Sequence, residues 1–118
     1  MINFLINQAI EEIEKEILPE IKIKNFEVIK VYRKRNYLGF YENGSCFDTP
    51  IIKLNMPGIE KESKAVNLPL YDIILTTIMH ELAHSLQQLK KDFKGWFDED
   101  EAESFAYDYW CYGIINEI

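Results

Sequence analysis

The residues best suited to chemistry in this chain are His80 and His84, its only two histidines, which lie four positions apart in the pentapeptide His-Glu-Leu-Ala-His. Residues at this spacing share one face of an α-helix, so both imidazoles can reach the same metal ion. Zinc accepts such nitrogen ligands at about 2.0–2.1 Å. Glu81, next to the first histidine, is then positioned to contact a water molecule on the metal without binding the metal itself.

This arrangement predicts the hydrolysis of an amide bond. A zinc ion lowers the pKa of its bound water, and Glu81 accepts the proton, which creates a nucleophile near neutral pH. The same carboxylate can then deliver the proton to the leaving amine. The structural alternative is a pair of packed histidines in a core helix. It is less favoured because the two residues lie opposite the apolar stripe of that helix, which consists of Ile74, Leu75, Ile78, Met79, Leu82, Leu86 and Leu89.

A third metal ligand has to come from a residue type other than histidine. A catalytic zinc site usually takes three protein ligands and leaves one position open, and the chain has no third histidine. An acidic run begins at Asp98, and carboxylates at a helix N-terminus are favourable there without any further role. Glu99 and Glu103 remain as candidates because their four-residue spacing places them on one helical face.

Together the two segments resemble a known family. HELAH followed by EDEAESFA, at residues 99–106, is similar to the gluzincin metallopeptidases, whose second motif is Glu-x-x-x-Asp or Glu-x-x-Ala-Asp on a following helix. The second segment also resembles the Glu-x-x-Ala-Asn-x-Phe-Ala motif of ImmA/IrrE-like peptidases. In size and element order the chain is most similar to the minigluzincins, minimal soluble scaffolds related to the catalytic domains of integral-membrane Ste24-like and HtpX-like peptidases.

The resemblance implies a role for each matching residue. His80, His84 and Glu99 would bind one zinc ion per chain, and Glu81 would be the general base and acid. Glu103 falls where the family has Asp or Asn, a group that orients a ligating histidine. The side chain of Glu103 is longer than either, which makes this residue the alternative ligand.

The remaining sequence supplies the elements that position these residues. Apolar residues at helical spacing predict an amphipathic helix over residues 2–18. Aromatic and β-branched residues, with an Asn-Gly turn signal, predict a small, mostly antiparallel sheet of three or four strands over residues 26–55. Three further elements are expected: a polar loop over 55–67, a long helix from Pro69 to Lys91, and a last helix opened by Asp98 with Glu101 in a capping box.

These elements predict one zincin-like α+β domain over residues 1–118, with a helix, a small sheet, the HExxH helix and a C-terminal glutamate helix. A chain of this length supports one core and not two. In the gluzincins the edge strand of the sheet pairs with an extended substrate. The resemblance therefore implies a peptide or protein substrate bound along the edge of the sheet, and segment 37–47 is the candidate edge.

Composition excludes several other classes of function. The net charge of −7 argues against a general affinity for nucleic acid or anionic membranes. No run approaches the roughly 18 apolar residues that a membrane span needs. The two cysteines, Cys46 and Cys111, form no disulfide framework, which is typical of a reducing compartment. We therefore expect a cytoplasmic protein.

Two other interpretations stay open at this point. A deformylase-like zinc amidase also carries HExxH on a helix, with an upstream cysteine as third ligand, and Cys46 is the residue in that position. The Gly-rich motif and the Glu-Gly-Cys context expected of that class are absent. The other alternative is a non-catalytic or latent zinc-binding interaction module. In its latent form, a chain terminus or the 55–67 loop would lie in the cleft.

Overall fold

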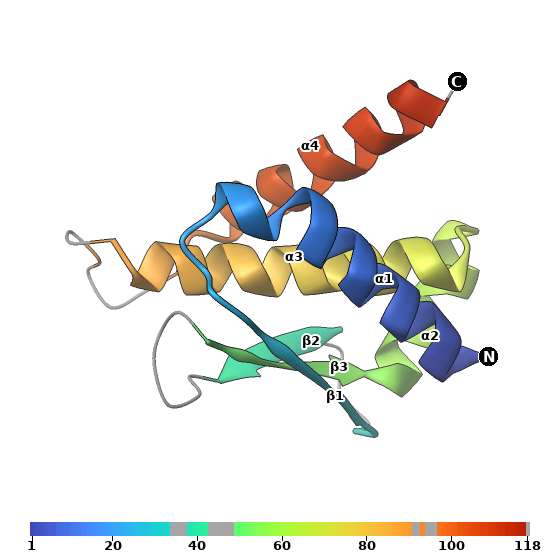
Figure 1. The fold of residues 1–118 in the computed structure, drawn as a ribbon. Helices are drawn as coiled ribbons and strands as arrows, with labels where there is room; N and C mark the ends of the chain where they lie inside the picture. The colour runs from blue at the N-terminus through green and yellow to red at the C-terminus, as the bar shows by residue number, and fades with distance from the viewer. Residues whose placement is uncertain (34–37, 43–48, 91–92, 94–96, 118) are drawn as a thin grey trace.

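The helix α3 lies at the centre of the molecule, with the sheet on one side and α1 and α4 packed on others (Figure 1). The computed structural model describes residues 1–33, 38–42, 49–90, 93 and 97–117. It combines helices with a sheet, so the predicted α+β class is confirmed at that level. Among the described residues, no helix combines the length and the apolar character needed to cross a membrane. The elements in chain order are α1 (Ile2–Glu16), η1 (Leu18–Glu20), β1 (Glu27–Val31), β2 (Gly39–Glu42), β3 (Ile51–Asn55), α2 (Met56–Val66), α3 (Leu70–Gln88) and α4 (Glu99–Glu117).

The three strands form one mixed sheet in the order β1-β3-β2. The central strand β3 runs parallel to β1, with Glu27 opposite Ile51, and antiparallel to β2, with Gly39 opposite Leu54. The prediction of a mostly antiparallel sheet is therefore not confirmed. The sequence pattern could not reveal the strand order, because a strand keeps the same alternation of side chains whichever way its neighbours run. The Asn-Gly signal at 43–44 lies outside the described residues.

The N-terminal helix follows its predicted pattern. α1 buries one face, formed by Ile6, Ala9 and Ile13. It ends at Glu16 and not at residue 18, and a short 3₁₀ turn containing Pro19 follows. Because proline has no backbone N–H and its ring clashes with the preceding turn, it cannot continue an α-helix, which explains the earlier end.

The segment 55–67, predicted as a polar loop, is largely the helix α2, and that prediction is wrong. Pro57 lies in the first turn of α2, where its missing N–H has no helical partner to lose. Met56 and Ile59 are buried, and Asn67 closes the helix in the left-handed conformation with φ at 55°. The loop prediction failed because polar residues dominate the segment and few of its side chains face the core.

Helix α3 is buried on nearly all sides and not along one stripe only. The predicted apolar side is inaccessible to solvent at residues such as Ile74 and Leu82. The opposite side is also covered, so His84 is only 5% exposed. α4 provides part of this cover, and its buried residues on the described part, Ala102 and Ala106, are small enough to let the two helices approach closely.

Strand β2 approaches α3 closely at Gly39. A Cβ atom at this position would lie 2.8 Å from Thr77 Cγ2, 3.0 Å from the carbonyl oxygen of Lys53 and 3.7 Å from Glu81 Cγ. The first two separations are shorter than ordinary van der Waals contacts. Thr77 cannot move away easily, since it is β-branched and its hydroxyl donates a hydrogen bond of 2.6 Å to the Ile73 carbonyl. The absence of a side chain at Gly39 therefore sets the distance between the sheet edge and α3.

We predict that Gly39→Ala lowers the free energy of unfolding by about 1–3 kcal/mol, the usual cost of overpacking. Thr77→Ser removes the methyl group that the new Cβ meets and keeps the hydroxyl, so the double variant should be more stable than the sum of the two single changes predicts. Urea denaturation of the parent, both single variants and the double variant measures this coupling. Strictly additive losses would contradict the proposed contact.

Candidate metal centre

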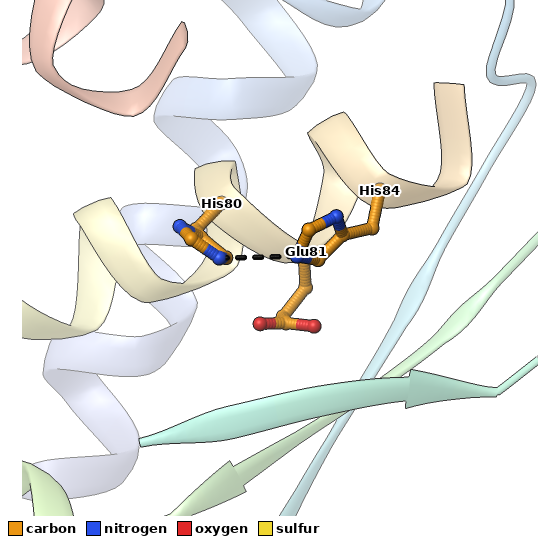
Figure 2. Close-up of side chains that lie close together, drawn as sticks. All are labelled: His80, Glu81 and His84. Atoms are coloured by element: carbon orange, nitrogen blue, oxygen red, sulfur yellow. Dashed lines mark hydrogen bonds between the residues drawn. The ribbon is translucent and has the colours of Figure 1, made fainter. Parts of the chain in front are cut away.

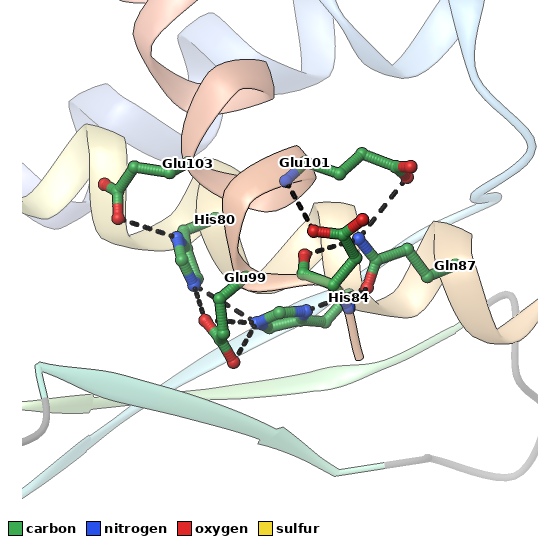
Figure 3. A network of polar contacts seen from close by, with 7 residues as sticks. His80, His84, Gln87, Glu99, Glu101 and Glu103 are labelled. Atoms are coloured by element: carbon green, nitrogen blue, oxygen red, sulfur yellow. Dashed lines mark hydrogen bonds and ion pairs between the residues drawn. The ribbon is translucent and has the colours of Figure 1, made fainter. Parts of the chain in front are cut away.

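Three electron-pair donors converge between α3 and the first turn of α4 (Figure 3). The Nε2 atoms of His80 and His84 lie 3.1 Å apart. The carboxylate of Glu99 approaches both, with Oε2 2.9 Å from His80 Nε2 and 3.2 Å from His84 Nε2. Unprotonated ring nitrogens and an ionised carboxylate are all acceptors, so they repel one another unless a cation or a proton lies among them. This geometry could therefore hold a metal ion.

The separations also fit the size of a zinc ion. Two atoms that each lie at about 2.0–2.1 Å from one tetrahedral zinc ion are about 3.3 Å apart, and the observed separations among the three donors run from 2.9 to 3.2 Å. The ligand atoms of His80, Glu81 and His84 all lie within 4.8 Å of one another, and this group could hold a metal ion. Two imidazoles and one carboxylate are a common donor set for catalytic zinc.

The other nitrogen of each ring indicates which tautomer is present. His84 Nδ1 lies 3.1 Å from Gln87 Oε1, which can only accept a hydrogen bond, so we assign the proton to Nδ1. His80 Nδ1 faces the carboxylate of Glu103 at 3.8 Å, which favours the same tautomer. In both rings the lone pair is then on Nε2, the atom that faces Glu99. This is the state that metal binding requires.

Gln87 connects the candidate ligand His84 to the start of α4. Its side-chain amide donates a hydrogen bond of 2.8 Å to the Asp98 carbonyl, and its Oε1 accepts one of 3.2 Å from the Asp98 backbone N–H. Gln87 itself is buried. One side chain therefore fixes the orientation of a ligand ring on α3 and the position at which α4 begins.

The predicted capping box at the start of α4 forms only in one direction. Asp98 Oδ1 accepts a hydrogen bond of 3.0 Å from the Glu101 backbone N–H, as predicted. The Glu101 carboxylate does not return to the Asp98 N–H, which Gln87 occupies. It accepts hydrogen bonds from the Gln87 amide at 3.3 Å and from Lys90 Nζ at 3.1 Å. The hydrogen bonds of Gln87 between α3 and α4 thus take the place of the second hydrogen bond of the capping box.

Sequence reasoning missed two contributions to this site. Gln87 follows His84 by three positions, so it lies on the same helical face, and that spacing was the signal available. Phe97 packs against the His84 ring with centroids 4.8 Å apart, and Phe93 packs on Phe97 at 5.4 Å. Nothing in the pattern around Phe97 indicated that it would pack against a histidine.

The two candidate glutamates lie on different sides of His80. Glu99 faces the Nε2 atoms of both histidines, whereas Glu103 faces only Nδ1 of His80, at 3.8 Å. The structure therefore brings Glu99, and not Glu103, to the point where the ring lone pairs converge. The side chain of Glu99 is 70% exposed, so solvent reaches the site from this side.

Glu81 lies beside the histidines and points toward strand β2 (Figure 2). The residue is only 7% exposed. Burial raises the pKa of its carboxyl group above the ordinary value of 4.5, because the charged form loses hydration. A proton on either His80 or His84 would lower this pKa in part, and the charge of Glu99 raises it further.

Other residues lie away from the site or outside the described part of the chain. Cys46, the ligand of the deformylase-like alternative, lies in the part of the chain that is not described, as do positions 37 and 43–47 of the expected substrate edge. The hydroxyl of Tyr71 donates a hydrogen bond to the carboxylate of Glu12 and so joins α3 to α1. In that position Tyr71 serves the packing of α1.

Comparisons with known proteins do not identify a family. No family model, no curated protein and no solved structure matches the chain. The resemblance to gluzincins thus stays a prediction from two short motifs. The arguments about function below rest on the geometry of the site.

We predict that Gln87→Leu, which keeps the bulk of the side chain but removes its polar atoms, weakens zinc binding by about 10–100-fold. The reason is that His84 loses the acceptor that holds its tautomer. Competition with a chromophoric chelator measures the affinity. Gln88→Leu is the matched control, since Gln88 is the same residue type turned about 100° around the helix. Gln87→Glu retains an acceptor and should lose less affinity, and equal losses at positions 87 and 88 would contradict this role.

We also predict a pH-dependent effect of Glu81→Gln on the stability of the protein kept metal-free with a chelator. Because the folded state raises the pKa of Glu81, this group contributes stability below its ordinary pKa, which is lost as the pH rises through the raised value. Glutamine does not titrate. The free energy of unfolding of the variant should therefore increase relative to the parent between pH 4 and pH 7. Chemical denaturation at several pH values checks this, and a difference that does not vary with pH would contradict it.

Proposed function

We propose that this chain is a zinc-dependent metallopeptidase of the gluzincin type, which hydrolyses peptide bonds. The observation that carries the proposal is the convergence of donor atoms from His80, His84 and Glu99 beside the buried carboxylate of Glu81. The three converging residues would hold the metal. Zinc, when bound, supplies Lewis acidity and lowers the pKa of a coordinated water molecule toward neutral pH.

Glu81 performs the proton transfers in this proposal. Its carboxylate accepts a proton from the attacking water and later donates that proton to the amine that leaves. A group that both accepts and donates a proton near neutral pH needs a pKa above that of an exposed glutamate. The burial of Glu81 supplies a shift in this direction.

Three protein donors favour a catalytic site over a structural one. Structural zinc sites are usually closed by four protein ligands, whereas catalytic sites keep one position open. Among the described residues, Glu99 completes the set with the two histidines, and Glu81 lies in the position of a base. Because Glu99 takes the third place, the site as described needs no upstream cysteine, which disfavours the deformylase-like alternative.

The substrate that we propose is a peptide in extended conformation. β2 forms one edge of the sheet and lies beside Glu81 through the contact at Gly39. An edge strand presents backbone N–H and C=O groups that another chain can pair with. An extended peptide added to β2 would pass close to the carboxylate that acts on its bond.

The proposal predicts different losses for the base and for the third ligand. With zinc supplied, the parent should bind about one zinc ion per chain and cleave members of a quenched fluorescent peptide library. Glu81→Gln should keep the zinc but reduce kcat/KM by about 10²–10⁴-fold, the usual contribution of a general base. Glu99→Gln should lose both zinc and cleavage. Elemental analysis after dialysis against a weak chelator gives the zinc content.

Two controls make this test specific. Asp100→Asn changes an exposed carboxylate in the same first turn of α4 and should leave the zinc content unchanged. Glu103→Gln should lose less zinc than Glu99→Gln. A parent chain that holds no zinc would refute the proposal. A chain that holds zinc but shows no cleavage dependent on Glu81 would be a non-catalytic or latent zinc-binding module.

A further inference from the structure

A pocket lies beside the candidate metal centre, between α2, the first two turns of α3 and the second and third turns of α4. Its volume is about 140 Å³. Glu103 lines this pocket and also faces His80 Nδ1 at 3.8 Å, so the pocket and the ligand set share a side chain. Thr76, another lining residue, precedes His80 by four residues, about 6 Å along the helix axis. A group held in the pocket is therefore close enough to belong to a substrate that reaches the metal ligands.

Part of the pocket wall is apolar. Leu38 precedes strand β2, Val66 and Leu68 come from the end of α2 and the residues after it, and Ile73 comes from α3. These side chains suit the methylene groups of a ligand. Because Leu38 immediately precedes the strand proposed to pair with a peptide, the wall is continuous with the proposed path of the substrate backbone.

Three other lining residues carry negative charge, and the uncharged Thr76 and Tyr107 complete the lining. Glu62, Asp72 and Glu103 each present a carboxylate, and they come from three different helices. Among the lining residues that the structure describes there is no lysine, arginine or histidine. A carboxylate in the first turn of a helix is favourable on its own, which accounts for Asp72. It does not account for Glu62 and Glu103, which lie beyond the first turns of their helices.

We propose that this pocket binds a basic side chain, of lysine or arginine, from a peptide substrate. The inference rests on the proposed peptidase function and adds a class of substrate to it. An aliphatic stem fits the apolar wall, and the cationic end group meets the carboxylates. A cavity of about 150 Å³ holds a group the size of benzene, so a pocket of this volume takes one side chain and not several.

The charge of the whole chain acts in the same direction. A net charge of −7 attracts basic peptides at long range and raises their rate of encounter. The carboxylates of the pocket then select where the basic residue is held. This selection should weaken as salt concentration increases, because partly exposed charges are screened.

The first test measures binding without relying on catalysis. Nα-acetyl-lysine N-methylamide and Nα-acetyl-norleucine N-methylamide share the same aliphatic stem but differ in charge. Each is titrated into the full-length, ¹⁵N-labelled chain supplied with zinc, and amide shifts are followed by NMR. We expect the lysine probe to bind about tenfold more tightly and to shift the amides of Val66, Leu68 and Thr76. Glu62→Gln and Asp72→Asn should each reduce this preference by about two- to fivefold, the range for single exposed ion pairs.

Glu60→Gln is the matched control, because Glu60 is an exposed residue of α2 outside the lining. It should leave the preference for lysine unchanged. Equal affinity for the two probes, shifts confined to other surfaces, or the same loss in Glu60→Gln would overturn the proposal. Binding of the lysine probe with no cleavage of any peptide would support the assignment of the pocket to a basic side chain and refute the peptidase function. A failure of the pocket assignment is therefore distinguishable from a failure of the proposed function.

The second test measures whether the pocket affects the rate of peptide cleavage. Quenched peptides that differ only by lysine or norleucine, scanned through the positions on either side of one bond, are compared with the zinc-loaded chain. We expect about a tenfold higher kcat/KM for lysine at one position, and a reduced ratio in Glu62→Gln and Asp72→Asn. Cleavage without preference at any position would overturn the assignment of the pocket to substrate.

Discussion

The packing of α4 against α3 is the interaction on which the rest of the site depends, because it brings three closely spaced electron-pair donors together. Two of the donors come from α3, which is held by burial on almost every side. The third, Glu99, arrives on α4, so the site exists only when α4 packs in the observed position. Small buried residues on α4 allow this close approach, and Gln87 fixes it by bonding to both backbone groups of Asp98. The core and the site therefore depend on the same helix contact.

Burying the carboxyl group of Glu81 lowers the stability of the folded state, and the packing of the fold does not require a carboxyl group there. A carboxylate in a helix that is otherwise well packed would be replaced by an apolar residue if stability were the only requirement. Thr77, His84 and Gln87 are further polar residues buried along the same helix. Each of the last two has a hydrogen-bond partner that also orients the site. Local conflicts of this kind are concentrated where proteins act on other molecules.

The sequence predicted those parts of the structure that short-range patterns determine. Periodicity located α1 and α3, and the capping residues Asp98 and Glu101 located the start of α4. The four-residue spacing of His80 and His84 was enough to predict that they share a face. The position of Glu99 near both rings was anticipated only through a resemblance. Three features depended on long-range packing and were missed: the helix α2, the insertion of β3 between β1 and β2, and the bridge through Gln87. In each case the deciding contact lies outside the local sequence, such as the burial of Met56 and Ile59 or the alignment of Glu27 with Ile51.

The strand order has a consequence for how the chain reaches its folded state. β2 and β3 are neighbours in sequence and pair antiparallel, whereas β1 pairs with β3 only after the chain has passed through β2. Closing the shorter loop costs less chain entropy, so β2 and β3 are expected to associate before β1 joins them. The edge beside Glu81 then belongs to the early pair, and the late strand completes the opposite edge. Errors in docking β1 would then lower the yield of folded protein even when β2 and β3 have paired correctly.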